Sequence, residues 1–350
     1  MPRQKRPTLT DLADAVGLSV NTVSRALTQK DGVSSRTREA VAREAERIGY
    51  VSPSRAARGS SKVVALTVTS SINVFILRLI PAVETALRAQ GYDMVLHITE
   101  ESADVENAVI AGMLEAEPAG AIVIPVQGDA SGWTDAGELP FPVVAVAREI
   151  PGRDGDFVAM DQHAAMYAAT RHALAQGARS LYFFDEDIDT MTNRIRVESF
   201  ESAVRAVPEA SGHVVPMPTR RFENRTSPWQ LEEAYRAVSA LLESDAAPDA
   251  MLFEDDYHAV GALRALAERG VRVPDDVLVI GYSDHPYTAY LQPSLTTVDV
   301  PFDLIAEAAV SLLLRRIAGD RTPPLRRLIP GELVVRESSV RQIVDPTPTM

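Results

Sequence analysis

Apolar residues in the first fifty positions recur at helical spacing, in three short runs separated by turn residues. Thr8 can cap a first helix, with Asp11 at its third helical position in a capping box, and Gly17 supplies the left-handed residue that ends it. The inner face of this helix is apolar and consists of Leu9, Leu12, Ala13 and Val16.

Two further helices follow at short intervals. Ser19 caps the second, over residues 20–27, in which Val23 and Leu27 face inward. Ser34 caps the third, whose apolar side consists of Val41, Ala45 and Ile48. Two helices joined by a tight glycine turn, with a third packed beneath them, form the layout of a helix-turn-helix.

From residue 63 onward, short runs rich in β-branched residues alternate with longer amphipathic stretches. Eight runs are predicted as strands: 63–69, 94–98, 121–124, 143–146, 181–184, 213–215, 251–253 and 277–280. Seven stretches are predicted as helices: 75–90, 104–116, 162–176, 194–207, 231–243, 259–269 and 302–317. The alternation predicts parallel sheets covered by helices on both faces, and it is too long for one such sheet. We therefore expect two lobes, with a ligand cleft where the carboxyl ends of their strands face each other.

Charge divides the chain at the same place. The net charge of −13 by itself argues against nucleic acid as a partner. Residues 1–62, however, hold 12 lysines and arginines against 6 aspartates and glutamates, whereas the remainder holds 23 against 42. A basic head on an acidic body is typical of a phosphate-binding module attached to a domain that does not touch DNA.

Composition excludes several classes of protein. The chain has no cysteine, so disulfides, thiolate metal ligands and a cysteine nucleophile are impossible. No apolar segment follows the charges at the N-terminus, and no run of 18 apolar residues occurs. We expect neither a signal peptide nor a membrane span, and we predict a cytoplasmic protein.

The second helix carries side chains that suit the major groove of DNA. Asn21 can pair bidentately with adenine, Arg25 with guanine, and Val20 can contact a thymine methyl group. Short hydroxyls suited to phosphates are those of Thr8, Ser19, Thr22 and Ser24. On this pattern alone, a three-helix protein-binding module stays an alternative.

The most specific motif covers the head. Residues 8–27 read TLTDLADAVGLSVNTVSRAL, and VSSRTR at 33–38 and Gly49-Tyr50 follow. In caps, turn and second helix, this segment resembles the head of the LacI/GalR family of repressors. The resemblance implies a homodimer that binds a near-palindromic operator.

Residues 51–62 stand where that family has a hinge, and here the sequence departs from the pattern. Ala57 matches the family alanine, but the leucine that family members insert into the minor groove is missing. Arg55 and Arg58 can enter a narrowed minor groove instead. A flexible linker with solvated arginines is an equal alternative.

The stretch from 63 to 340 resembles a periplasmic-binding-protein-type effector domain, which implies two lobes joined by three crossovers. The expected lobes comprise about 63–160 with 296–325, and about 161–295 with 326–340, before a tail over 341–350. The landmarks of the resemblance are Asn73-Val-Phe75, Asp161, RVESF at 196–200, FEDDYHAVG at 253–261, VIGYSD at 279–284 and PSLTTVD at 293–299.

By that resemblance, nine residues are expected to face the cleft: Ser70, Asn73, Phe75, Arg148, Arg196, Trp229, Asp255, Ser283 and Phe302. Arginine forks and a carboxylate can hold vicinal hydroxyls, and aromatic faces suit a sugar ring or a planar base. Core packing is the alternative role for each aromatic residue. The two arginines favour an acidic or phosphorylated sugar over a neutral hexose, whereas Asp255 favours the reverse. Arg196 and Asp255 are expected to line one water-accessible cavity, on opposite sides of the effector.

No enzyme motif competes with this interpretation. The sequence lacks a phosphate-binding GxxxxGK[ST] loop, an HExxH pair and a GxSxG elbow. Ser283, Asp284 and His285 are consecutive, so they cannot adopt the geometry of a catalytic triad. Asp255 and Asp256 are adjacent and point in different directions, which argues against a metal site. We expect no enzyme activity, metal or cofactor.

The sequence therefore predicts a small all-α helix-turn-helix head followed by an α/β body of two lobes with parallel sheets. Its predicted function is that of a DNA-binding transcription regulator, a repressor, whose operator affinity a sugar or sugar derivative controls by shifting the lobe angle. Two alternatives stay open: a purine- or nucleoside-responsive regulator of the same fold, and a sugar-binding receptor module that does not bind DNA. The tail has two prolines and no heptads, so a dimer is expected rather than a coiled-coil tetramer.

Overall fold

The structure is a computed structural model of the 350-residue chain, and it describes residues 7–27, 32–48, 50, 61–128, 132–220, 229–244 and 246–341. The chain divides into two units, residues 1–61 and 62–350, which we call the head and the body. The predicted hinge residues Arg55, Ala57 and Arg58 and the tail beyond 341 lie outside the described residues.

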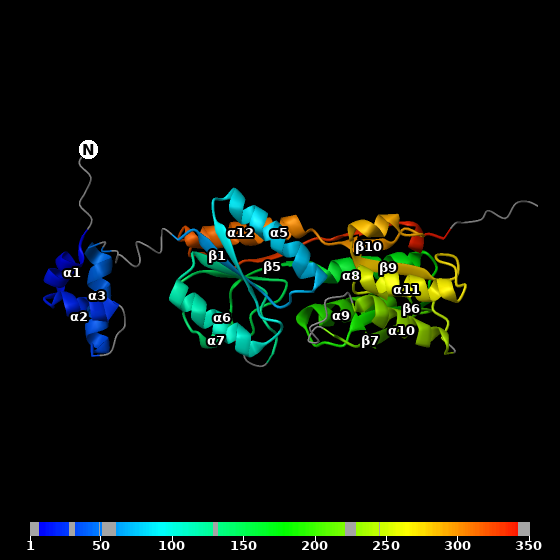
Figure 1. Cartoon of the computed structure of the whole chain (residues 1–350), viewed down its shortest axis with the longest axis horizontal. Coiled ribbons are helices and arrows are strands. Elements are labelled where there is room, and N and C mark those ends of the chain that lie inside the picture. Colours follow the sequence, from blue (N-terminus) through cyan, green and yellow to red (C-terminus); the bar gives the residue numbers. More distant parts are fainter. Residues whose placement is uncertain are drawn as a thin grey trace, which may run out of the picture. The chain divides into compact units, whose positions relative to one another are not determined.

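The described residues of the head form the three predicted helices (Figure 1): α1 (Leu9–Val16), α2 (Val20–Leu27) and α3 (Ser35–Ile48). Thr8 and Asp11 form the expected capping box, and Gly17 adopts a φ of 67° at the end of α1. Ser19 and Ser34 cap α2 and α3, each accepting the backbone N–H three residues on, at 3.1 and 3.2 Å. The inner faces meet in one core that comprises Leu12, Ala13, Val23, Ala26, Val41, Ala45 and Tyr50.

The body contains two six-stranded sheets. The strands of the first are β1 (Val63–Val68), β2 (Asp93–Ile98), β3 (Gly120–Val123), β4 (Val143–Val146), β5 (Asp156–Met160) and β11 (Arg326–Ile329). Those of the second are β6 (Ser180–Glu186), β7 (Ser211–Met217), β8 (Ala250–Phe253), β9 (Leu278–Ser283), β10 (Thr296–Asp299) and β12 (Glu332–Val334). Their orders are β11-β5-β4-β3-β1-β2 and β12-β10-β9-β8-β6-β7, so both lobes share one connectivity.

The chain crosses between the lobes after β5, after β10 and between β11 and β12, which confirms the three crossovers. The expected lobe bounds at 296 and 326 are wrong, because β10 still belongs to the second sheet and β11 to the first. The physical reason is that β10 and β11 each pair along their length with a strand of their own sheet before the chain crosses to the other lobe. β11 pairs parallel with β5 and runs toward the second lobe, whereas β12 enters that lobe and runs away from the cleft. The β10–β12 pair is accordingly antiparallel, and the other described strand pairs are parallel.

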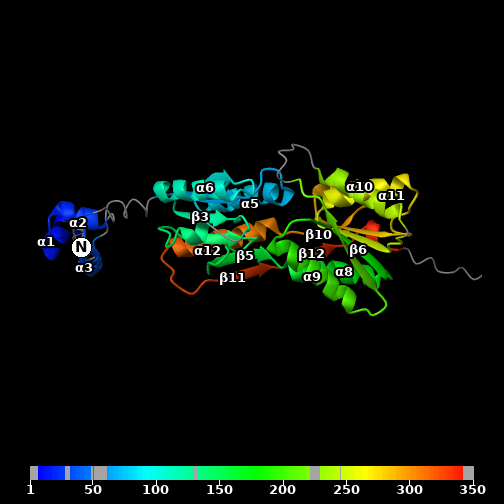
Figure 2. The ribbon, with the colours of Figure 1, turned by 90° about the horizontal axis from the view of Figure 1, so that it is seen from below.

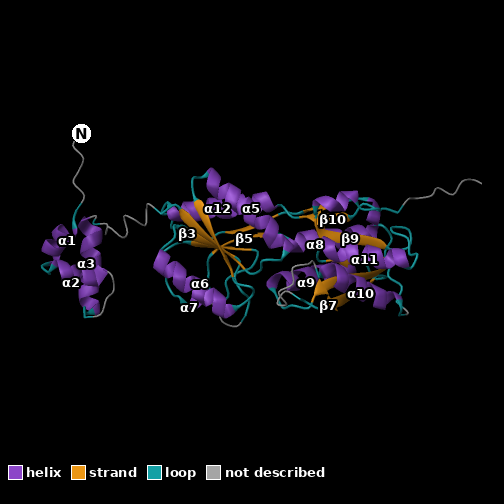
Figure 3. Ribbon diagram, viewed as in Figure 1, coloured by secondary structure: helices purple, strands orange, loops and turns teal. Residues whose placement is uncertain are grey.

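Helices cover both faces of each sheet (Figures 1 and 3). On the first sheet, α5 (Val74–Ala89) and α12 (Phe302–Ile317) lie on one face, and α6 (Ala103–Ala116) and α7 (Gly132–Asp135) lie on the other. On the second, α8 (Gln162–Ala175) and α9 (Met191–Arg205) lie opposite α10 (Gln230–Leu242) and α11 (Asp256–Glu268) (Figure 2). Short 3₁₀ turns occur at Pro286–Tyr290 and Glu337–Ser339. Central strands such as β3 and β9 are buried along their whole length, as expected for parallel sheets covered on both sides.

Candidate functional site: a cavity between the lobes and a helix-turn-helix surface

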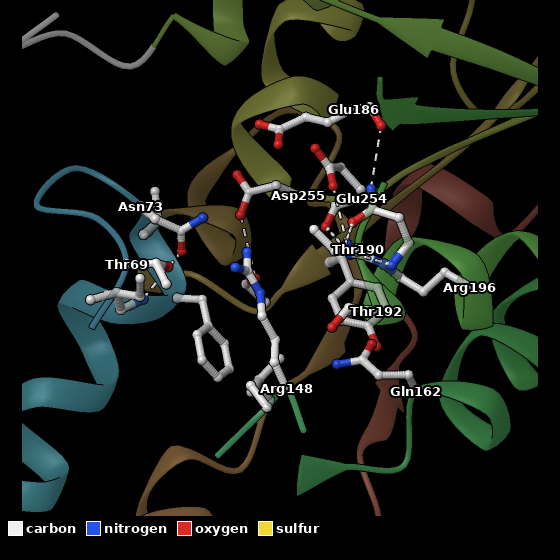
Figure 4. Close-up of a pocket in the computed structure, with 18 of the residues that line it drawn as sticks. Thr69, Asn73, Arg148, Gln162, Glu186, Thr190, Thr192, Arg196, Glu254 and Asp255 are labelled. Atoms are coloured by element: carbon white, nitrogen blue, oxygen red, sulfur yellow. Dashed lines mark hydrogen bonds and ion pairs between the residues drawn. The ribbon is translucent and has the colours of Figure 1, made fainter. Parts of the chain in front are cut away.

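A cavity lies between the lobes, at the carboxyl ends of their strands (Figure 4). Its volume is about 110 Å³, whereas a single water needs about 10–15 Å³, so the cavity has room for several waters or a small ligand. The residues that line it are Thr69, Asn73, Val74, Phe75, Ile76, Ile124, Ala147, Arg148, Gln162, Glu186, Thr190, Thr192, Asn193, Arg196, Gln230, Glu254, Asp255, His258, Tyr282, Ser283 and Val300.

In the first lobe, the turn between β1 and α5 forms one wall of the cavity. Ser70 Oγ accepts the N–H groups of Ile72 and Asn73 at 3.2 Å each, which shapes the turn. Asn73 then caps α5 by accepting the N–H of Ile76 at 3.3 Å. The next residue but one, Phe75, presents its ring to the cavity and packs its other side on Phe302, with the ring centroids 5.3 Å apart.

Arg148 lies at the end of β4 and is already paired. Its two terminal nitrogens donate to the two carboxylate oxygens of Glu101, both at 2.9 Å, and both side chains are buried. Ala147, before the arginine, adopts a φ of 62°, which is unusual for a residue other than glycine. Because the carboxylate takes both arms of the guanidinium fork, Arg148 brings little free positive charge to a ligand.

Arg196 lies in the first turns of α9 and is held by β6 and β8. Its guanidinium donates to the backbone carbonyl and to the carboxylate of Glu254, at 3.1 Å each, and lies 3.9 Å from Asp185. All three side chains are buried. Burial raises the pKa of Asp185 although the Arg196 charge acts in the opposite direction. Arg196 therefore lines the cavity from within a buried ion-pair cluster.

Asp255 and Asp256 follow β8 and face different surroundings, as expected. Asp255 caps α11 by accepting the N–H of Tyr257 at 2.8 Å, and Ser283 Oγ donates to it at 3.4 Å. Asp256 faces away from the cavity and accepts from Thr297 Oγ1 at 2.6 Å and from the N–H of residue 285 at 2.9 Å. Burial, followed by the nearby charge of Asp255, raises the pKa of Asp256 well above its usual value. Of these two neighbouring aspartates, Asp255 is thus the one that lines the cavity.

Six of the nine predicted cleft residues line the cavity: Asn73, Phe75, Arg148, Arg196, Asp255 and Ser283. Ser70, Trp229 and Phe302 lie behind that lining. Trp229 is buried with its ring edge-on to His258, at 5.8 Å between centroids. Phe302 lies between Phe75 and the guanidinium of Arg78. These two aromatic residues therefore pack in the core, which was the alternative role, and do not line the cavity.

The sequence-based prediction did not include the other polar residues that line the cavity. It also did not include the acidic residues that pair with the two arginines. Gln162, Thr190, Asn193 and Gln230 occupy the starts of helices, and Glu186 and Glu254 end strands. The rule that ligands bind at carboxyl ends of strands could have found these positions. Glu101 carried no local signal, because it lies 47 residues from Arg148 in the chain.

On the head, the predicted contact residues are divided between exposed and structural positions. Val20, Asn21 and Arg25 are exposed on α2 and lie outside the core of the head. The hydroxyls of Thr8 and Ser19 are engaged in capping, the first with Asp11 and the second with Thr22. Ser24 is half-buried. The exposed face of α2 therefore has the three side chains to which base contacts were assigned.

In the described part of the chain, histidine, aspartate and glutamate residues form no group of three or more that could hold a metal ion. None of the described helices combines the length and the apolar character that a membrane span requires.

A helix-turn-helix head joined to a two-lobed binding domain defines a class of one-component regulators, and comparison with known proteins gives the family. Residues 8–53 match the bacterial regulatory proteins of the lacI family, and residues 170–339 match a periplasmic binding protein-like domain. The HTH-type transcriptional regulator reg1 of Streptomyces lividans is 30% identical over 336 residues, which cover 95% of this chain and 96% of that protein. The ribose operon repressor of Halalkalibacterium halodurans is 29% identical and covers 95% of this chain, with 97% of its own length matched.

Solved structures agree with this assignment. The transcriptional regulator CelR in complex with cellobiose superimposes with a TM-score of 0.68 at 26% identity, over 95% of this chain and 100% of that one. A lac repressor dimer bound to operator has a TM-score of 0.71 at 21% identity, over 96% of this chain and 100% of that one, which supports the fold. The chain belongs to the LacI family: it is a DNA-binding transcription regulator with an effector-binding body, and its relatives are regulators rather than enzymes.

Proposed function

We propose that this regulator is a cytoplasmic homodimeric repressor of a near-palindromic operator, and that its effector is a neutral sugar or sugar derivative bound between the lobes. The observation that carries the proposal is the state of the cavity's charges. Both arginines are paired, Arg148 with Glu101 and Arg196 with Glu254. Asp255 has a carboxylate at the surface of the cavity, with the imidazole of His285 3.6 Å away and no arginine or lysine paired with it among the described residues. An anionic ligand would have to break a buried ion pair, whereas hydroxyl groups can donate to Asp255 directly. The earlier preference for an acidic or phosphorylated sugar is therefore not kept.

A second feature favours a ligand with hydroxyl groups. Thr69 is fully buried and lines the cavity, and its Oγ1 has no hydrogen-bond partner among the described residues. A buried hydroxyl without a partner is destabilising, and a ligand hydroxyl would supply one. Among tyrosine, tryptophan and phenylalanine residues, only Phe75 and Tyr282 line the cavity in the described chain. Because Trp229 and Phe302 are not available for stacking, a planar purine fits less well than a sugar ring.

The dimer is supported by an edge of the body. β2 is the last strand of its sheet, and Val95, Leu96 and Ile98 on it are 36–44% exposed. An edge strand with exposed apolar side chains is a template for association unless another surface covers it. Light scattering at micromolar protein should report a dimer, and a stable tetramer would contradict the proposal.

A thermal-unfolding screen tests the effector. A ligand that binds only the folded state at 100 times its Kd raises the free energy of unfolding by about 2.7 kcal/mol. We expect one or more neutral sugars to raise the melting temperature, and sugar phosphates and purines to leave it unchanged. The Asp255→Ser variant, which keeps a side-chain oxygen to cap α11, should lose the shift. A shift produced only by anionic sugars or purines would reject the proposed class.

Operator binding tests the head. Replacing Arg25 with alanine should weaken binding to the cognate operator by about 1–3 kcal/mol and relax specificity at one base pair. Thr22→Ala should weaken all sequences alike, because a phosphate contact carries no sequence information. Fluorescence anisotropy on DNA from the protein's own promoter region, and on random DNA at matched salt, measures both effects. Equal losses on the two DNAs for Arg25→Ala would show that the recognition face is wrongly assigned.

A further inference from the structure

A dipeptide at the end of β9 adopts an unfavourable backbone conformation beside the cavity. Ser283 has a φ of 107° and Asp284 a φ of 43°, and neither residue is glycine. Such conformations persist only where the surroundings hold them, and they concentrate at sites that bind or switch. Ser283 lines the cavity, and its hydroxyl donates to Asp255. The dipeptide therefore belongs to the second lobe and to the ligand-facing surface.

The carbonyl groups of this dipeptide are held by the other lobe. Arg78, on α5, donates from Nη1 to the carbonyl oxygen of Ser283 at 2.6 Å and to that of Asp284 at 3.3 Å. The guanidinium lies over the ring of Phe302, 4.4 Å from its centroid. Phe302 packs in turn on Phe75, which lines the cavity from the first lobe. Arg78 is thus connected with the cavity through Ser283 of the second lobe and through Phe302 and Phe75 of the first.

The side chain of Asp284 is fixed separately. Its carboxylate pairs with Arg336 at 2.8 Å and accepts from Thr288 Oγ1 at 3.1 Å, and its N–H donates to Thr297 Oγ1 at 3.2 Å. These contacts attach residue 284 to the second lobe without using its carbonyl. The carbonyls of the dipeptide are consequently available to a donor from the first lobe, and Arg78 is the donor that meets them.

We infer that Arg78 is a positioning residue that links the angle between the lobes to the backbone of Ser283 and Asp284. Any change in lobe angle moves Arg78 relative to these two carbonyls, and any rotation of the dipeptide moves the cavity-facing hydroxyl of Ser283 with them. The contact thus transmits the state of the cavity to the first lobe. Its link to operator binding rests on the proposed function, whereas the contact itself does not.

The distance between labels on the two lobes tests this inference without an effector. The chain has no cysteine, so Glu115→Cys on α6 and Glu198→Cys on α9, both exposed, carry the only spin labels. Labelled chain is diluted into an excess of unlabelled chain, so that an assembly holds at most one labelled copy. Pulsed electron paramagnetic resonance then gives the distribution of interlobe distances in the full-length protein.

Three variants are compared in this labelled background. Arg78→Met keeps an apolar stem over Phe302 and removes the donors, and we expect its distance distribution to broaden or its mean to shift. Arg78→Lys, which keeps the charge and one donor group, should recover part of the original distribution. The matched control is Arg88→Met on the same helix, whose exposed guanidinium pairs only with Glu84, at 3.3 Å, in the contacts of the described chain; it should leave the distribution unchanged.

Two outcomes would overturn the inference. One is an Arg78→Met distribution that superimposes on that of the parent, and the other is an equal change in Arg88→Met, which would indicate a general effect of losing charge from α5. Circular dichroism checks that each variant folds, and Arg78→Gln takes the place of Arg78→Met if that variant does not. Because no effector or DNA is added, failure here leaves the proposed function standing, and failure of the sugar screen leaves this inference standing.

Discussion

The two lobes of the body share one strand order but bring different chemistry to the cavity between them. The first lobe contributes mainly apolar and neutral groups, together with an arginine whose fork Glu101 occupies. The second contributes most of the polar lining, including two carboxylates that end strands, Asp255, and the start of α9. We call the lining from the second lobe the polar face and the lining from the first lobe the covering face.

The pKa values of three buried aspartates also differ between the lobes. In the first lobe, burial pushes the pKa of Asp156 upward, but the hydrogen bonds from Arg316 and from the N–H of Leu325 outweigh it, and the pKa is lowered. In the second lobe, burial dominates at Asp185 and Asp256, and both pKa values are raised. Asp185 and Asp256 are therefore held buried at the expense of stability, as is common near functional sites.

The largest effect is expected from breaking the ion-pair cluster of the second lobe. Arg196→Met leaves the carboxylates of Glu254 and Asp185 buried without their guanidinium, and loss of one partner of a buried pair costs about 3–5 kcal/mol. Urea denaturation measures the loss. It should shrink as the pH falls, because protonation removes the charges that the variant leaves buried.

The control for this variant lies on the same helix. Arg194→Met removes an arginine whose side chain is 57% exposed and pairs with the exposed Asp189, and exposed pairs contribute only about 0–1 kcal/mol. A loss in Arg196→Met as small as that in Arg194→Met would contradict the view that the second lobe depends on this cluster.

A medium effect is expected on effector binding, and it should differ between the lobes. Asp255→Ser removes a charged acceptor from the polar face, and we expect at least a tenfold loss of affinity for the sugar that the screen identifies, since charged hydrogen bonds contribute about 1.5–3 kcal/mol. Phe75→Leu reduces the covering face while keeping an apolar side chain, and a loss of less than tenfold is expected. Isothermal titration of both variants measures the difference, with the exposed Asp275→Ser as control. A greater loss for Phe75→Leu would reverse the assignment of the two faces.

The sequence predicted features that depend on residues close together in the chain better than features that depend on residues far apart in it. The caps of the head and the turn at Gly17 are set by residues three or four positions apart, and the structure has them as predicted. The eight strands with long apolar runs were also found. β5, β10, β11 and β12 were not assigned, because they are short or carry charged residues and owe their strand conformation to neighbours elsewhere in the sheet.

Within the site, the positions of functional residues were easier to predict than their electrostatic states. Asp255 and Arg196 follow from motifs at strand and helix ends, so their presence in one cavity could be anticipated. The pairing of Arg196 with Glu254 joins residues 58 apart, and nothing local to the arginine indicates it. The expectation of an acidic effector arose because this pairing could not be predicted. Arg196 was treated as available to a ligand, whereas in the folded lobe its charge is neutralised by Glu254.

The smallest effect is expected from pH, and here Asp156 of the first lobe and Asp256 of the second should respond with opposite signs. Asp156 has a lowered pKa when folded, so its contribution to stability is present above its ordinary pKa of about 3.9 and is lost as the pH falls through the folded value. Asp256 has a raised pKa, so its contribution to stability is complete below about pH 3.9 and is lost as the pH rises through the folded value.

Asp156→Asn should therefore cost most at neutral pH and least in acid. Asp256→Asn, whose amide can still accept from the N–H of residue 285 and donate to Thr297, should cost least at neutral pH. Denaturation of both variants and the parent from acid to neutral pH gives the two differences in free energy of unfolding as functions of pH. Slopes of the same sign would show that Asp156 and Asp256 are not held in opposite ways.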